Sequence, residues 1–245
     1  MKKFLMLLFL IFFCTETFAG WNNEYSGTIG NLKIGMTLRS DGQNISGEYF
    51  YDKWLRDIPI KGNIDNKNNV VLYEYDCNGN IIALFKGRFF NCSNFNSGCG
   101  LVEGVWSKAD ESGSKNFKIE LIYSTYYKPG KGRYYVAGFD NDVAVEVFVQ
   151  QFWKAVNYKD KNKVADMIYY PISVFIDGKN VKIKNKAGMI KNYNQIFYSD
   201  FCKKIKNLVP HHLFAKYSGI MLGNGEIWFR SIGKRIKVVA INNKK

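Results

Sequence analysis

Hydrophobic and polar side chains alternate with a period of two over residues 32–39, 57–64 and 117–123. This spacing is typical of β-strands that bury one face. Turn sequences such as Asn78-Gly79 separate the alternating stretches. Strands that recur at short intervals with tight turns predict an antiparallel meander over residues 20–126, either closed as a barrel or paired as a sandwich.

The hydrophobic period changes after residue 140. Apolar residues then recur at the i, i+3, i+4, i+7 and i+11 positions of a helix, as Val145, Phe148, Val149, Phe152 and Val156. Polar residues hold the opposite face, and Asp140 or Asn141 is a suitable N-cap. We therefore expect an amphipathic helix to open a second domain.

The remaining pattern predicts a mixture of helices and strands. A second helix at 161–170 must end before Pro171, because proline disfavours helical geometry in the residue that precedes it. A hairpin around Asp177-Gly178 follows. The later expected elements are a third helix at 186–208 and three strands at 212–221, 225–231 and 235–242.

The first 19 residues have the pattern of a secretory signal. Lys2 and Lys3 precede an unbroken apolar run from Phe4 to Phe13, and Ala19 is a suitable cleavage position. An uncleaved anchor is the alternative, but ten residues make a helix of about 15 Å, half of the roughly 30 Å hydrocarbon core. A lipoprotein cysteine at Cys14 is disfavoured by the bulky residues before it. We expect a periplasmic or secreted protein with no transmembrane anchor after cleavage.

The expected organisation is a signal peptide (1–19), an antiparallel β domain (20–126), a linker (127–139) and an α+β domain (140–245). The last domain carries a resemblance to a known superfamily in the segments FVQQFWKAVNYKD, KVADMIYYP, GIMLGNGEIWFR and GKRIKVVAINN. Their order is similar to that of the nuclear transport factor two-like, or SnoaL-like, superfamily. The first domain looks like an unassigned small β module of exported bacterial proteins.

The resemblance implies a cone, made by a curved antiparallel sheet wrapped around three helices, with an apolar pocket at its open end. The fold class is then α+β. Aromatic side chains that would line or fill such a pocket are Phe152, Tyr169, Tyr170, Tyr193, Phe197 and Trp228. An open pocket would bind a ligand, whereas a filled one would make the cone a scaffold.

Export changes how the cysteines are interpreted. Cys92 and Cys99 flank a short polar loop that contains glycine, so we expect them to form a disulfide in an oxidising compartment. Cys77 and Cys202 either pair with each other or stay free. A zinc site is the competing use, but the chain has no Cys-x-x-Cys and only two histidines, so we expect no metal.

No motif in the sequence dictates a reaction or a cofactor. There is no Gly-x-Ser-x-Gly, no His-Glu-x-x-His and no glycine-rich phosphate loop. We interpret Asp166 as a solvated helix residue and Glu226 as a charge at a strand edge. His211 and His212 follow Pro210 and are interpreted as polar loop residues, with a general base as the alternative. We assign no catalytic residue.

The chain is strongly basic, with 35 Lys and Arg against 21 Asp and Glu. Candidates for a basic patch are Lys203, Lys204, Lys206, Lys234 and Arg235. The exported address argues against nucleic acid. The excess charge either maintains solubility or steers an acidic envelope protein to the surface.

These features favour a non-enzymatic binding protein of the bacterial envelope. The expected partner is a protein, with the chain acting as an accessory factor or as an inhibitor or immunity partner of an envelope-targeting hydrolase. One alternative is a carrier of a small apolar ligand, or an isomerase-like enzyme, using the cone pocket. Another is a cell-wall glycan-binding module that uses aromatic residues such as Trp54.

Overall fold

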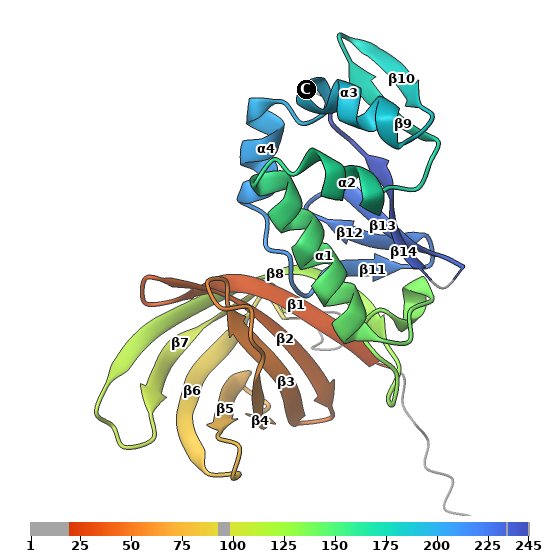
Figure 1. Cartoon of the computed structure of the whole chain (residues 1–245). Helices are drawn as coiled ribbons and strands as arrows, with labels where there is room; N and C mark the ends of the chain where they lie inside the picture. The colour runs from red at the N-terminus through yellow and green to blue at the C-terminus, as the bar shows by residue number, and fades with distance from the viewer. Residues whose placement is uncertain (1–19, 93–98, 234, 245) are drawn as a thin grey trace, which may run out of the picture.

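The computed structural model describes residues 20–92, 99–233 and 235–244 as two adjoining parts (Figure 1). The first part is an all-β unit, and the second combines four α-helices with two small sheets. The expected signal peptide and Lys234 lie outside the described residues. Within the described ranges, no helix combines the length and the apolar character that crossing a membrane requires.

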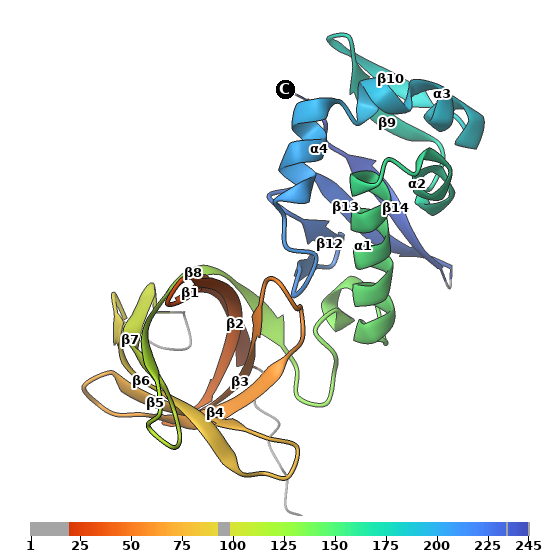
Figure 2. The ribbon, with the colours of Figure 1, turned by 60° about the vertical axis from the view of Figure 1, so that its left-hand side comes forward.

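The first part is a closed antiparallel barrel, which confirms the barrel and removes the sandwich alternative. Each strand pairs with the next, and β1 pairs with β8 to close the ring, as Figure 2 shows. The strands are β1 (Gly20–Ile29), β2 (Leu32–Asp41), β3 (Asn44–Tyr51), β4 (Ile58–Ile64), β5 (Asn69–Tyr75), β6 (Ile81–Phe90), β7 (Leu101–Lys108) and β8 (Ser114–Tyr127).

Alternation along the strands sorts side chains between the barrel interior and its outer surface. In β2, Ile34, Met36 and Leu38 are buried in the barrel core. Glycines occur where neighbouring strands approach too closely for a side chain. A Cβ at Gly47 would lie 1.9 Å from the carbonyl oxygen of Thr37, so the curvature here requires glycine.

The second part begins after a short 3₁₀ turn, η2 (Tyr135–Ala137). The helix predicted from the 3.6-residue period is α1 (Asp142–Asn157), and its N-cap Asn141 accepts a hydrogen bond from the Ala144 amide. The other elements are α2 (Lys161–Met167), β9 (Ile172–Ile176), β10 (Lys179–Ile183), α3 (Lys186–Ile196), α4 (Ser199–Lys206), β11 (Phe214–Lys216), β12 (Gly219–Leu222), β13 (Ile227–Ile232) and β14 (Arg235–Ile241).

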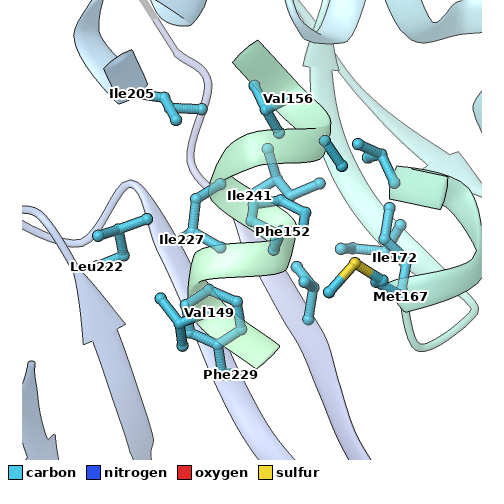
Figure 3. Close-up of a cluster of buried hydrophobic side chains, with 14 of the residues drawn as sticks. Val149, Phe152, Val156, Met167, Ile172, Ile205, Leu222, Ile227, Phe229 and Ile241 are labelled. Carbon is cyan, nitrogen blue, oxygen red and sulfur yellow. The ribbon is translucent and has the colours of Figure 1, made fainter. Parts of the chain in front are cut away.

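Helix α1 packs on the four-stranded sheet β11-β12-β13-β14 and supplies much of the second core. Val149, Phe152 and Val156 on one face of α1 meet Ile227 and Phe229 of β13 (Figure 3). The rings of Phe152 and Phe229 meet edge to face with centroids 5.7 Å apart. The apolar stripe of α1 is therefore fully used in folding.

Two elements that were expected to be continuous are each interrupted in the structure, so these two predictions were wrong. The helix expected at 186–208 is divided into α3 and α4, since Phe197 and Tyr198 leave helical geometry. The break stacks the Phe197 ring on Tyr193, with centroids 4.9 Å apart. The strand expected at 212–221 is divided into β11 and β12, where Gly219 adopts a φ of 132° that few other residues accept.

Other local predictions are confirmed or need only a change of boundary. The hairpin β9-β10 turns at Asp177-Gly178, both with positive φ as a two-residue hairpin loop requires. Helix α2 ends at Met167 rather than at residue 170, because Ile168 is extended and bridges to Val238 of β14.

The expected disulfide between Cys92 and Cys99 is present. The remaining two cysteines of the described chain do not pair with each other. Cys77 is exposed, and the Cys202 thiol donates to the Phe197 carbonyl oxygen at 3.2 Å.

Candidate functional site between the barrel and the helical unit

A buried group of charged and polar side chains lies where the two parts meet. The barrel contributes outward-facing residues of β1, β2 and β3, including Glu24, Thr37 and Glu48. The second part contributes Arg133 from the segment after β8, Glu146 from α1, and the pair His211 and His212 that precedes β11. We call these residues, with Asp57 of the β3–β4 loop, the interface cluster.

Arg133 is the central cation of the interface cluster. Its guanidinium pairs with Glu24, donates to Glu48 Oε1 at 2.7 Å and donates to Thr37 Oγ1 at 2.9 Å. The side chains of Arg133 and Glu24 are only 8% and 5% exposed. Burial alone would lower the pKa of Arg133, but the two carboxylates outweigh it and hold the pKa above its usual value. The interface is therefore fastened by a buried ion pair.

A second arginine extends this network along the barrel surface. Arg39 forms a two-pronged bond with Glu48, at 2.8 and 2.6 Å, and donates to the Asn22 side chain at 2.6 Å. Such paired hydrogen bonds fix the geometry of both partners. Desolvation opposes ionisation of Glu48, yet Arg39 and Arg133 keep the pKa of this carboxyl below its usual value.

The two histidines stack on each other beside a phenylalanine. Their ring centroids are 4.3 Å apart, and Phe50 meets both rings edge on, at 4.5 and 4.9 Å. Phe50 itself lies over Gly35, where a Cβ would come within 2.3 Å of the ring. Gly35 thus leaves the space that lets Phe50 support the histidine pair.

The backbone of His212 is held in an uncommon conformation, with a φ of 48°. Its amide donates to Glu146 Oε1 at 3.1 Å, and its carbonyl oxygen accepts from the Tyr123 hydroxyl at 2.7 Å. Left-handed backbone at a non-glycine residue persists only where surrounding contacts enforce it. Here both parts of the protein enforce it, since Tyr123 belongs to β8 and Glu146 to α1.

Every ring nitrogen of the pair has a partner. His211 Nδ1 lies 2.9 Å from Glu146 Oε2, and His212 Nδ1 lies 3.1 Å from Thr37 Oγ1. The Nε2 atoms of both histidines lie 2.9 Å from one oxygen, Asp57 Oδ1. Two imidazole nitrogens and one carboxylate oxygen, from distant parts of the sequence, therefore lie close together.

Glu146 anchors the α1 side of the cluster. Besides His211 and His212, it accepts a hydrogen bond from the Tyr134 hydroxyl, which itself accepts from the Leu213 amide at 3.1 Å. Burial would raise the pKa of Glu146, but His211 and the Tyr134 hydroxyl lower it overall. Asp57 likewise has its pKa held below the usual range by the two histidines, against the effect of desolvation. Both groups are carboxylates at neutral pH.

The same contacts act in the opposite direction on His211. Desolvation disfavours the charged ring, but hydrogen bonds to Asp57 and Glu146 raise the pKa of His211 to about 9. In the absence of any other cation, His211 therefore carries a proton at neutral pH. This is unlike a histidine of an ordinary polar loop, so that interpretation was wrong.

Two clefts flank the cluster. One, of about 400 Å³, has mainly apolar walls that include Met36, Phe50, Phe214 and Met221. The other, of about 480 Å³, is polar and runs past Arg39, Glu48, Asp57, Arg133 and Glu146. The histidine pair lines both clefts, so small molecules or ions in either cleft can reach it.

The order Thr37–His212–Asp57 is similar to a nucleophile–base–acid relay, but it does not fit nucleophilic catalysis. Thr37 is fully buried, and its hydroxyl donates its proton to Glu24 at 2.7 Å. A nucleophile must be able to meet a substrate and to give its proton to the base. We therefore assign Thr37 a positioning role.

The aromatic pocket candidates do not gather around one opening. Phe152, Tyr193 and Phe197 belong to the second core, although the last two also border a surface cleft of about 420 Å³. Tyr169 is exposed, and the Tyr170 hydroxyl donates to the Ala165 carbonyl oxygen. Trp228 lies under the Lys216 ammonium, 4.9 Å from the ring centre.

The basic-patch candidates divide between two places. Lys203, Lys204 and Lys206 lie on α4, whereas Arg235 begins β14. Lys204 is not a free charge, because it pairs at 2.5 Å with Glu226. The Glu226 side chain is only 5% exposed, so its interpretation as a strand-edge charge was wrong. Asp166 does lie in solvent, where it pairs with Lys186.

Sequence reasoning missed most of the interface cluster. Arg133 lies in the expected linker, Glu146 on the polar face of α1, and Asp57 in a barrel loop. The one available signal was the adjacency of the chain's only two histidines. Compared with known proteins, this chain matches no family model, no curated protein and no solved structure.

Proposed function

We propose that this chain is an exported binding protein of the bacterial envelope and that it binds an acidic protein. Binding takes place on a surface that we call the lysine face, made of Lys53, Lys154, Lys159, Lys203 and Lys206. This surface extends over the β3–β4 loop, the C-terminal half of α1, the turn between α1 and α2, and α4. The expected signal peptide supports export, and the Cys92–Cys99 disulfide is compatible with an oxidising compartment.

The observation that carries the proposal is that most lysines of the lysine face have no acidic partner, although Asp52 lies in the cleft beside Lys53. Among the described residues, Lys53, Lys154, Lys159 and Lys206 form no ion pair, whereas Lys203 pairs with Asp200. Two neighbouring clefts connect the set, because Lys206 lines both, one with Lys159 and Lys203 and the other with Lys53 and Lys154. A surface with an excess of one charge speeds association with an oppositely charged partner.

Exposed aromatic residues add a second element of recognition. Trp54 is an exposed residue of the β3–β4 loop, with the Lys53 ammonium 5.6 Å from its ring centre, and Tyr158 is exposed at the end of α1. Tryptophan and tyrosine are the side chains that most often carry binding energy at protein interfaces. The interface cluster supports this use, because it fastens the loop and the helices into one platform.

The second part serves this function as a scaffold. We infer that it is a member of the SnoaL-like group of folds, with the cone filled by Phe152, Tyr193 and Phe197. The packing of α1 on a four-stranded antiparallel sheet supports this assignment. A filled interior favours protein binding at the surface over transport of a ligand inside.

The test is affinity capture from the extracytoplasmic fraction of the source bacterium, using the processed chain as bait. A charge-reversed variant carries Lys154→Glu, Lys159→Glu and Lys206→Glu. We expect an acidic protein that is retained by the wild-type chain, released by salt, and bound about tenfold more weakly by this variant.

The matched control carries Lys67→Glu, Lys86→Glu and Lys115→Glu, which change the net charge equally on the barrel. This control should retain the partner. Equal losses in the two variants would show a general charge effect, and capture of no partner at low salt would contradict the proposal.

A second candidate function is binding of a small apolar ligand in the cleft of about 400 Å³ at the interface. Met36, Phe50, Phe214 and Met221 give this cleft apolar walls, and such clefts between domains are common ligand sites. A fluorescent apolar probe that binds the wild-type chain should bind more weakly to Met221→Trp, because the larger side chain fills the cleft. Binding unchanged by this substitution would exclude the cleft.

A further inference from the structure

The protonation of the two histidines in the interface cluster is a separate question from protein binding on the lysine face. His211 Nε2 and His212 Nε2 each lie 2.9 Å from Asp57 Oδ1, and all three atoms lie within 4.8 Å of one another. A hydrogen bond to a carboxylate oxygen needs a proton on the nitrogen. The question is therefore which ring nitrogens carry protons.

For His211 the partner of Nδ1 decides. Glu146 Oε1 already accepts hydrogen bonds from the Tyr134 hydroxyl and the His212 amide, and a carboxylate oxygen only accepts. Because His211 Nδ1 lies 2.9 Å from Glu146 Oε2, this nitrogen must be the donor. A neutral His211 then carries its one proton on Nδ1 and turns a bare Nε2 towards Asp57.

For His212 the same conclusion follows from Thr37. The Thr37 hydroxyl has one proton, which it donates to Glu24, and its oxygen also accepts from Arg133. Only a lone pair remains to meet His212 Nδ1, 3.1 Å away, so this nitrogen is also a donor. A neutral His212 likewise turns a bare Nε2 towards Asp57.

With neutral rings, three atoms bearing lone pairs face one another, which is unfavourable unless a cation lies among them. We propose that Asp57, His211 and His212 form a binding site for a divalent transition-metal ion, with Zn²⁺ as the best match. Two imidazole nitrogens and a carboxylate oxygen are a common protein ligand set for zinc. One ion can bind all three atoms at once, and it then takes the place of the additional proton that His211 carries in the metal-free chain.

The surroundings have the features of a supported metal site. Glu146 and Thr37 hold the two Nδ1 atoms from different elements, as the outer partners of metal-bound histidines do. The left-handed backbone of His212 brings its ring beside that of His211. Both rings thereby direct Nε2 to the same oxygen.

The site is also reachable from solvent. The Asp57 side chain is 47% exposed and lines the polar cleft of about 480 Å³ together with both histidines. Three protein ligands leave a coordination position for water or for a group of a bound molecule. The chemistry therefore corresponds to an accessible site rather than to a closed structural one.

The experiment is a titration of the metal-stripped full chain with Zn²⁺, followed by calorimetry, and with Co²⁺, followed by its visible absorption. We expect one ion per chain and a Co²⁺ spectrum of low coordination number with nitrogen ligands. Asp57→Asn should fold, because the side chain is half exposed, and should weaken Zn²⁺ binding at least tenfold. Asp110→Asn, in an exposed turn, is the matched control and should bind like the wild type.

Glu146→Gln tests the outer partner and should weaken Zn²⁺ binding about 10–100-fold. Two results would overturn the proposal. One is Zn²⁺ binding of equal strength in the wild type, Asp57→Asn and Asp110→Asn, which would locate the ion elsewhere. The other is an NMR spectrum in which both rings remain doubly protonated at neutral pH after Zn²⁺ is added. Neither result depends on the lysine face or its partner.

Discussion

Replacing Arg133 by methionine is expected to destabilise the protein by about 3–5 kcal/mol, the usual cost of leaving one member of a buried ion pair without its partner. The structure places most of this cost on Glu24. Glu48 keeps its two-pronged bond with Arg39, but Glu24 would keep only the Thr37 hydroxyl among the partners described above. A carboxylate that is 5% exposed would then be left uncompensated.

The assay is urea unfolding at pH 7, followed by far-ultraviolet circular dichroism. A matched control is Lys118→Met, which breaks the exposed pair with Glu103 at 3.1 Å and should cost less than about 1 kcal/mol. Adding Glu24→Gln to Arg133→Met should recover part of the loss, because the second change removes the unpaired charge. An Arg133→Met cost no larger than that of the control, or no recovery in the double variant, would refute the reasoning.

Three further predictions follow from the same geometry. In the metal-stripped chain, the raised pKa of His211 contributes stability that is fully present below its unfolded value of 6.5 and is lost as pH rises through about 9. Urea unfolding should show that the free energy of unfolding falls by up to about 3 kcal/mol over this pH range, and His211→Gln should remove most of this pH dependence. Reducing the Cys92–Cys99 disulfide should lower stability by roughly 2 kcal/mol, measured by melting with and without dithiothreitol, and an unchanged melt would contradict this. Gly35→Ala should displace Phe50, cost about 1–3 kcal/mol and weaken Zn²⁺ binding, whereas wild-type values for both would show that Phe50 does not support the histidines.

The strands of the barrel could be predicted from the sequence because the alternation of apolar and polar residues is a local pattern. Alternation in β2 directly predicts that Ile34, Met36 and Leu38 face the barrel core and that the residues between them face outward. The same holds for α1, where a 3.6-residue period marks the face that packs on β13. The alternation could not decide between a barrel and a sandwich, since that depends on the pairing of β1 with β8, which alternation along a strand does not encode.

The break between α3 and α4 and the interface cluster both depend on tertiary contacts. Phe197 fits the apolar stripe of a continuous helix, and only its stacking on Tyr193 shows why the chain breaks there. His211 and His212 were visible as an adjacent pair, but their chemistry comes from Asp57 and Glu146, more than 60 positions away in the sequence. Polar residues at such separations leave no periodic signal, so the pair was interpreted as part of a loop.

The ring closure of the barrel has a consequence for the order of events during synthesis. Gly20 pairs with Tyr127, so the first strand has no final neighbour on that side until more than 100 further residues have been made. Contacts this distant along the chain form late, because their loop-closure entropy must be overcome first. Arg133 follows only six positions after Tyr127. We therefore expect β1 of the nascent chain to stay available to chaperones until the barrel closes and Arg133 forms its ion pairs.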